Sequence, residues 1–501
     1  MKILSIHEGH DPNVSFLTED TLVHIEQERI SRIKHLHNNK SKKVIEKLIK
    51  DFDFDVIVSS MTENKDDVKI YTEFEDEYIP QNKQIYISHH LAHAAYVYYT
   101  RPEKIDKCDI LAYDGWGMET DRYFYNESKK LIDTSTFGLG LLWELFSLRF
   151  FNKMHQEGKI MGMVAYGVFN KSIYKKYEDA LNILQKLKIT TDVNIVNEAK
   201  EVLKNIYYIY KVEDIAHTLQ KFSENKTIEY LKKVKSSKTL LISGGIGLNG
   251  YINQKINSLY DEVYISPATS DSGVSVGGAL LVANKRLPKP AYIGRQQNIT
   301  ENTLGIIKQL NLTHKKFNYD YIADKIIQGK IIALYQGHSE SGPRALGNRS
   351  ILADPRSGVV KEYINKYIKH REWYRPYAPA ILEEEVSNWF EDLTTSPYML
   401  KIAKYKKGKG ELVAGVCHKD YTGRVQSVSK NDNLKLYLLI ETFFKRTGIP
   451  ILLNTSFNIQ EPIVDTPVDA LRTFAKSNLD LLILEDYIIE KNNDRFIISN
   501  S

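Results

Sequence analysis

The sequence predicts an α/β protein with more than one domain. Short apolar segments rich in β-branched residues alternate with segments of helical character, and this alternation is typical of α/β sheets. The chain has 501 residues, which is more than one ordinary domain holds. Apolar residues make up 42% and charged residues 26%, a balance typical of globular rather than disordered proteins.

The first part of the chain is expected to form short strands separated by turns. The expected strands are Lys2–Ile6, Thr21–Glu26, Asp55–Ser59, Gln84–Ile87, Asp109–Tyr113 and Arg122–Asn126. The first apolar run is too short for a signal peptide, and no window approaches the ~20 apolar residues that cross a bilayer. We therefore expect no membrane segment and a cytoplasmic protein.

Helices and strands alternate again after residue 140. The apolar run Leu141–Phe151 is predicted to be helical, and residues 170–238, rich in Lys and Glu and without proline, to form several helices. The elements expected next are strand Thr239–Ser243, helix Leu248–Leu259, strand Glu262–Ile265 and helix Ser275–Asn284.

A domain boundary is predicted within residues 286–317, where Pro288 and Pro290 precede a polar run. We expect one domain over residues 1–295 and a second over 296–501. The elements expected in the second are strands Ile331–Tyr335 and Ile449–Leu453 and helices Glu362–His370 and Leu434–Arg446.

The charge and cysteine content exclude several classes of protein. The net charge is only +5, whereas a dedicated nucleic-acid binder usually has a strongly basic face. Two cysteines, Cys108 and Cys417, exclude a disulfide scaffold and a Cys-rich zinc module.

Two histidines one helical turn apart form a candidate metal site. His89 and His93 follow an expected strand, and their spacing places them on one helix face. Asp114 and Asp271 each lie where a strand ends, the edge at which ligands of open α/β sheets gather. Two His and two carboxylates suit Fe(II), Mn(II) or Zn(II). Core histidines and turn aspartates remain the alternative interpretation.

The Gly-rich loop Ser243–Asn249 lies between a strand and a helix. Backbone N–H groups of Gly244 and Gly245 could approach a phosphate there, with the helix N-terminus adding positive potential. A tight structural turn explains the pattern equally well.

Arginine is concentrated in one segment. The chain has 16 Arg against 52 Lys, and five of the Arg lie within 32 residues. These five are Arg344, Arg349, Arg356, Arg371 and Arg375. Because Arg binds phosphate through two parallel hydrogen bonds, this cluster predicts a site for a polyanion such as ATP or an acyl phosphate.

These motifs together resemble the NodU/CmcH-type O-carbamoyltransferases of nodulation and antibiotic biosynthesis, nearly from end to end. The motifs that carry the resemblance are Gly9-His10-Asp11, Glu28-Arg29-Ile30-Ser31-Arg32-Ile33-Lys34-His35, His89-His90-Leu91-Ala92-His93-Ala94, Asp114-Gly115, Gly158-Lys159-Ile160-Met161-Gly162, Gly244-Gly245, Asp271-Ser272-Gly273, Gly342-Pro343-Arg344-Ala345-Leu346-Gly347-Asn348-Arg349-Ser350-Ile351-Leu352, Asn454-Thr455-Ser456-Phe457-Asn458 and Glu461-Pro462-Ile463-Val464.

The resemblance implies two catalytic domains. The N-terminal domain would be a duplicated fold similar to sugar kinases, actin and heat-shock chaperones, as in the tRNA threonylcarbamoyl transferases. The C-terminal α/β domain would be YrdC-like. It would form carbamoyl-adenylate from ATP and carbamoyl phosphate with Mg(II), and the N-terminal domain would transfer the carbamoyl group to an acceptor hydroxyl.

The resemblance also implies roles for individual residues. His89, His93, Asp114 and Asp271 would bind a metal ion, expected to be Fe(II), and His10 would be the general base for the acceptor. Lys369, Arg371 and Arg424 would act on the reacting phosphates. The nucleotide-binding residues would be Gly244, Gly245, Asn249, Arg344, Arg349, Arg375, Asn454, Ser456 and Asn458.

Several alternatives stay open on the sequence alone. The motif that starts at Asn454 reaches Glu461 one residue sooner than is usual in the family, which leaves the nucleotide contacts open. The acceptor is expected to be a hydroxylated small molecule, with a nucleotide or DNA base as a possibility, and the protein a monomer or homodimer. The alternative functions are a tRNA threonylcarbamoyladenosine-type enzyme and a non-catalytic nucleotide-binding protein of the same fold.

Overall fold

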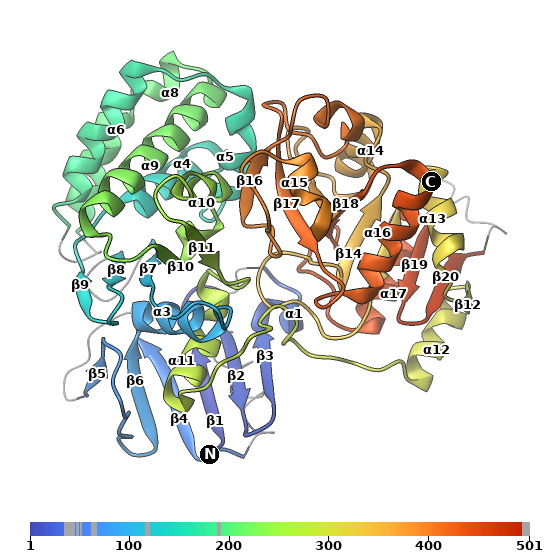
Figure 1. The fold of residues 1–501 in the computed structure, drawn as a ribbon, viewed down its shortest axis with the longest axis horizontal. Helices are drawn as coiled ribbons and strands as arrows, with labels where there is room; N and C mark the ends of the chain where they lie inside the picture. Colours follow the sequence, from blue (N-terminus) through green and yellow to red (C-terminus); the bar gives the residue numbers. More distant parts are fainter. Residues whose placement is uncertain are drawn as a thin grey trace.

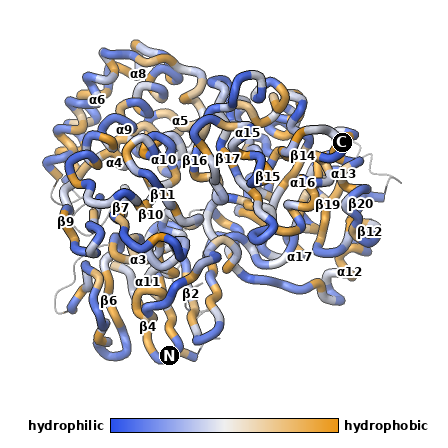
Figure 2. Tube along the Cα trace, in the orientation of Figure 1, coloured by the Kyte–Doolittle hydropathy of each residue, from blue (hydrophilic) through white to orange (hydrophobic). Residues whose placement is uncertain are grey.

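The computed structural model describes residues 1–34, 46, 50, 53–61, 68–115, 121–187 and 192–492. Within these residues, three β-sheets are flanked by helices, which confirms the predicted α/β class (Figure 1). Apolar side chains of the strands form the cores between the layers, and polar stretches follow the outer helices (Figure 2). None of the helices in the described ranges is both long and apolar enough to span a membrane.

The first sheet has the strand order β3-β2-β1-β4-β6-β5. β1 pairs antiparallel with β2 and parallel with β4, and β4 pairs parallel with β6. The strands are β1 (Ile3–His7), β2 (Asn13–Leu17), β3 (Leu22–Glu26), β4 (Val56–Met61), β5 (Ile70–Tyr71) and β6 (Gln84–Ser88). Neither β2 nor β5 was expected from the sequence.

The second sheet, of order β11-β10-β7-β8-β9, repeats the pattern of the first. β7 pairs antiparallel with β8 and parallel with β10, and β10 pairs parallel with β11. The strands are β7 (Asp109–Tyr113), β8 (Arg122–Tyr125), β9 (Leu131–Asp133), β10 (Thr239–Ser243) and β11 (Glu262–Ile265). Because five strands share order and direction in both sheets, the predicted duplication of the fold is confirmed.

Two helices, α3 (His89–Thr100) and α11 (Val274–Ala283), pack against each other between these two sheets (Figure 1). α3 contacts β7 and β10, and α11 contacts β1, β2 and β4. The helices approach closely because a Cβ at Gly277 would lie only 2.0 Å from the Ala92 carbonyl oxygen. This close contact brings the start of α11 beside the start of α3.

A helical lobe covers the second sheet and forms a core with it. Its helices are α4 (Leu139–Phe151), α5 (Glu157–Met163), α6 (Lys171–Leu184), α7 (Val193–Leu203), α8 (Ile206–Ile209), α9 (Val212–Val234) and α10 (Gly250–Ile256). The prediction of several helices over 170–238 is confirmed. The helix expected over Leu248–Leu259 is shorter, since its N-terminal end is a 3₁₀ turn over Gly245–Leu248.

The third sheet has nine strands in the order β12-β20-β19-β13-β14-β18-β15-β17-β16. Its strands are β12 (Leu312–Lys316), β13 (Ile332–Tyr335), β14 (Arg349–Ala353), β15 (Ala378–Leu382), β16 (Lys401–Lys404), β17 (Thr422–Val428), β18 (Ile451–Ser456), β19 (Leu481–Leu484) and β20 (Tyr487–Lys491). The helices around it are α12 (Glu301–Gln309), α13 (Tyr319–Ile327), α14 (Gly358–Tyr363), α15 (Val386–Trp389), α16 (Leu434–Thr447) and α17 (Pro467–Lys476).

Two expectations for this part of the chain need correction. The predicted boundary region 286–317 contains α12 and β12, and β12 pairs with β20, so the third sheet begins inside it. The helix expected over Glu362–His370 begins earlier, at Gly358, and continues beyond Tyr363 as a π-helical turn. A division of domains at 295/296 remains our proposal.

Candidate metal centre and anion-binding cavity

The four predicted metal ligands come from three places in the chain, after strands of two different sheets. His89 and His93 lie in the first turns of α3, which Ser88 caps by accepting a hydrogen bond from the Leu91 amide. Asp114 follows the last residue of β7, and Asp271 lies in the turn before α11. The packing of α3 on α11 therefore brings residues 182 positions apart into contact.

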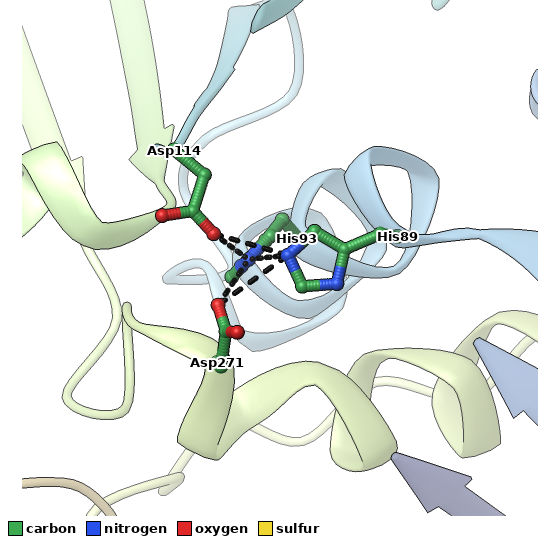
Figure 3. A group of neighbouring side chains, drawn as sticks. All are labelled: His89, His93, Asp114 and Asp271. Carbon is green, nitrogen blue, oxygen red and sulfur yellow. Dashed lines mark hydrogen bonds and ion pairs between the residues drawn. The ribbon is translucent and has the colours of Figure 1, made fainter. Parts of the chain in front are cut away.

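The four side chains point to one centre (Figure 3). His89 Nε2 lies 3.0 Å from Asp114 Oδ2 and 3.3 Å from Asp271 Oδ1, and His93 Nε2 lies 3.1 and 3.3 Å from the same two oxygens. The four atoms all lie within 4.8 Å of one another. Metal–ligand bonds of about 2.0–2.2 Å place neighbouring ligand atoms about 3.0–3.5 Å apart, so the donor set fits a divalent ion.

The charges of this cluster are strongly coupled. Burial alone would lower the pKa of His89, but the charge of Asp271 and the hydrogen bonds with both carboxylates outweigh it and raise the pKa to about 10. The same contacts hold the pKa of Asp271 well below its usual range despite burial. Two buried carboxylates thus require positive charge beside them, which a divalent cation would supply.

The Gly-rich loop after β10 holds one of these ligands. Asp114 Oδ1 accepts hydrogen bonds from the amides of Gly115 at 2.8 Å and Gly245 at 3.2 Å. Gly244 has φ +96°, and a Cβ there would lie 2.0 Å from the Tyr113 carbonyl oxygen. Asn249 caps α10 by accepting from the Ile252 amide. In this structure, the loop predicted to bind phosphate orients Asp114.

A third histidine, His7, borders the metal centre, and the sequence reasoning did not single it out. His7 Nε2 lies 3.5 Å from Asp271 Oδ2 and 3.0 Å from the His10 carbonyl oxygen, so this nitrogen carries the hydrogen. A Cβ at Gly9 would lie 2.8 Å from the His7 ring, which explains the glycine of the Gly9-His10-Asp11 motif. His10 itself contacts Asp11 at 3.2 Å and its ring lies 3.8 Å from that of His155.

A cavity of about 280 Å³ lies between the N-terminal part of the chain and the third sheet. Four of the predicted Arg and two polar residues of the Asn454 motif line it, namely Arg344, Arg371, Arg375, Arg424, Ser456 and Asn458. Residues from the N-terminal part line it as well, namely Glu28, Lys34, Gly158, Met161, Gly162, Ala165, Tyr166 and Tyr251. Neither Lys34, which lies in the motif at residues 28–35, nor Tyr251 was among the expected site residues, because a local motif does not show which side chains reach a distant site.

The cavity gathers positive charge with little to balance it. Burial and the neighbouring Arg375 lower the pKa of Arg344 to about 10, and burial together with Arg344 lowers the pKa of Arg424 well below its usual range. Among the described residues that line the cavity, Glu28 is the single acid. A ligand that carries several negative charges would relieve this repulsion.

Glu340 orders the loop that carries Arg344. Its Oε1 atom accepts from the backbone amides of Leu346 at 2.7 Å, Asn348 at 2.7 Å and Arg349 at 3.1 Å. Glu340 is only 1% exposed. Three amides converging on one buried carboxylate oxygen fix the path of the loop.

The structure corrects the expectation for Arg349. Its guanidinium is fully buried, donates to the carbonyls of Gln336, Gly337 and Asn348, and lies 3.6 Å above the Tyr335 ring. Through these contacts, the Arg349 side chain holds the loop and does not line the cavity. Asn454 has a similar place, since its amide donates to the Ala345 carbonyl and to Gln426.

Lys369 lies behind the cavity wall. Its buried ammonium contacts the Ser456 carbonyl at 2.5 Å, the Asn458 carbonyl at 2.7 Å and Asn458 Oδ1 at 2.6 Å. Burial and Arg371 lower the pKa of Lys369 well below its usual range. Lys369 therefore contacts the two polar residues that line the cavity, and it is not itself among the residues that line it.

The family assignment follows from comparison with known proteins. Residues 79–280 match the model of the carbamoyltransferase N-terminus, and residues 323–491 match that of the carbamoyltransferase C-terminus. The chain therefore belongs to the carbamoyltransferase family of enzymes, which confirms the resemblance seen in the sequence.

Individual relatives agree with this assignment. An uncharacterized protein of Methanocaldococcus jannaschii, MJ1058, is 32% identical over 80% of this chain and 73% of its own length. The nodulation protein NolNO of Sinorhizobium fredii is 31% identical over 81% of this chain and 64% of its own. A 3'-hydroxymethylcephem-O-carbamoyltransferase of Amycolatopsis lactamdurans is 32% identical over 44% of this chain and 42% of its own. The chain thus spans less than two thirds of the last two proteins.

Proposed function

We propose that this protein is an ATP-dependent O-carbamoyltransferase with two active sites. The observation that carries the proposal is the presence, on one chain of this family, of a cavity lined by four Arg and a separate cluster of two His and two Asp. The cavity suits two phosphate-bearing substrates, and the cluster suits a divalent metal. The metal is expected to be Fe(II), and the C-terminal half to be YrdC-like.

The first half-reaction would take place in the cavity. Water cleaves carbamoyl phosphate to carbamate and phosphate, and a carbamate oxygen then attacks the α-phosphorus of ATP, so that carbamoyl-adenylate forms and pyrophosphate leaves. Together with Mg(II) on the substrates, Arg344, Arg371, Arg375 and Arg424 would neutralise the reacting phosphates. Lys369 would position Ser456 and Asn458 at the cavity wall.

The second half-reaction would use the metal centre. His89, His93, Asp114 and Asp271 would hold the ion, which supplies Lewis-acid polarisation of a carbonyl when bound. His10, whose ring contacts Asp11, would accept the proton of the acceptor hydroxyl. The acceptor is proposed to be a hydroxylated small molecule, since one relative is named for transfer to a hydroxymethyl group.

The test is to follow AMP release from ATP. AMP should appear only when carbamoyl phosphate and a hydroxylated acceptor are both present, and mass spectrometry should show one carbamoyl group added to the acceptor. Failure to detect AMP across sugars, antibiotic cores and hydroxymethylated nucleosides would contradict the proposal. Modification of tRNA in the same assay would favour a threonylcarbamoyladenosine-type enzyme instead.

A further inference from the structure

One residue of the cavity wall, His418, has a ring nitrogen without a hydrogen-bond partner among the described residues. His418 lines the cavity and is 8% exposed. Its Nδ1 atom lies 3.0 Å from Thr422 Oγ1, whereas its buried Nε2 atom makes no hydrogen bond to any residue in the described part of the chain. A buried polar atom without a partner is costly, and such atoms often mark a ligand contact.

The hydrogen bonds around His418 determine which nitrogen carries the hydrogen. The Thr422 hydroxyl donates its only hydrogen to Asp420 Oδ1 at 2.7 Å. Its oxygen can therefore only accept from His418, so Nδ1 bears the N–H. The other nitrogen, Nε2, is left with a bare lone pair. Asp420 is itself held by the hydroxyl of Tyr251, at 3.1 Å, from the N-terminal part of the chain.

The surroundings keep this imidazole neutral. Burial, together with the nearby Arg424 and Lys361, lowers the pKa of His418 to about 4 against the opposing charge of Asp420. A neutral imidazole retains an acceptor at neutral pH. The cavity wall around it is rich in guanidinium and ammonium groups, which donate hydrogen bonds but cannot accept them.

We propose that His418 Nε2 accepts a hydrogen bond from the –NH₂ group of the carbamoyl substrate and so selects carbamoyl phosphate over acyl phosphates that lack this group. The inference rests on the proposed function of the cavity. At neutral pH, phosphate oxygens only accept hydrogen bonds, so the Nε2 acceptor of His418 needs a donor on another part of the ligand. The carbamoyl –NH₂ group is a donor close to a phosphate, since its carbonyl carbon is bonded to a phosphate oxygen, and His418 lies beside Arg424, which we propose to bind phosphate.

The ribose hydroxyls and the adenine amino group of ATP are the competing donors. An experiment can distinguish these donors from the carbamoyl amide, because they belong to the other substrate. Loss of an adenosine contact would weaken the binding of ATP. Loss of the carbamoyl contact would weaken the binding of carbamoyl phosphate and leave that of ATP unchanged.

The test measures pyrophosphate release from ATP with carbamoyl phosphate or with acetyl phosphate, which has a methyl group in place of –NH₂. The wild type should prefer carbamoyl phosphate by at least about 1,000-fold in kcat/KM, because a site that binds an N–H group rejects an analogue without it. His418→Phe should lower kcat/KM for carbamoyl phosphate about 10- to 100-fold, with KM for ATP and activity on acetyl phosphate unchanged. His418→Gln, whose amide oxygen can replace Nε2, should restore part of the preference.

His314→Phe on the exposed strand β12 is the matched control and should behave as wild type. Thermal unfolding of each variant tests folding independently of activity. An unchanged substrate preference in a folded His418→Phe variant, or an effect on ATP alone, overturns the inference while the proposed function stands. Absence of carbamoyl phosphate-dependent pyrophosphate release in the wild type overturns the proposed function and, with it, the inference.

Discussion

Removal of the Glu340 carboxylate should release the loop that carries Arg344. In Glu340→Ala, the amides of Leu346, Asn348 and Arg349 lose their shared acceptor inside the protein. Each buried amide left without a partner costs about 1–3 kcal/mol, so the loop should lose about 3–6 kcal/mol of local stability after some relaxation. In Glu340→Gln, an amide oxygen remains, and the loss should be about 1–2 kcal/mol.

Hydrogen exchange followed by mass spectrometry measures this loss directly. Peptides that cover residues 341–349 should exchange about 100-fold faster or more in Glu340→Ala and about 10-fold faster in Glu340→Gln. Glu391→Ala is the control, because Glu391 makes only an exposed ion pair with Lys404 at 3.8 Å and should leave exchange unchanged. Equal exchange in wild type and Glu340→Ala would refute the reasoning that the three amides depend on this carboxylate.

Two further predictions concern the metal centre and a buried acid. His89→Ala removes one of the four proposed metal ligands, so the metal bound per chain, measured by plasma mass spectrometry, should fall at least tenfold. Carbamoyl transfer should stop in this variant, while pyrophosphate release continues. Equal loss of both half-reactions would count against two separate sites. Burial raises the pKa of Glu26 to about 7 although Arg29 opposes this, so the folded state holds a proton that the unfolded state releases near pH 4.5. The contribution of Glu26 to stability should therefore be fully present below about pH 4.5 and decrease by about 3 kcal/mol as the pH rises through 7, and Glu26→Gln should remove this part of the dependence in urea unfolding measured across that range. A Glu26→Gln variant with the wild-type pH profile would show that Glu26 is not the group responsible.

Local patterns in the sequence predicted most strands of the first two sheets, only β13 and β18 of the third, and the four side chains of the candidate metal centre. The strands before His89 and Asp114 were visible as apolar runs, and the i, i+4 spacing of His89 and His93 placed both on one helix face. β2 escaped prediction because the alternation of polar and apolar residues in Asn13–Leu17 covers only four residues, and its pairing with β1 and β3 is what makes it a strand. Likewise, α12 and β12 lie in a polar segment whose structure depends on contacts with α17 and β20.

Side-chain direction was the part that local patterns did not determine. Arg344 and Arg349 are five residues apart in one motif, yet one lines the cavity and the other holds backbone carbonyls. His7, rather than His10, contacts Asp271. His418 lines the cavity but was not among the expected site residues. Such outcomes depend on which residues from distant segments converge, which a single motif does not encode.

By itself, the sequence determined the α/β class, the family and the four side chains that could hold a metal, because these depend on residue type and short-range spacing. The tertiary structure decided which groups share a site. The close packing of α3 on α11 joined two histidines to two aspartates, and the contact between the N-terminal part and the third sheet enclosed the cavity. The physical reason is that hydrogen bonds and charges act over a few ångströms, so their partners are set by the packing of sheets and helices and not by distance along the chain.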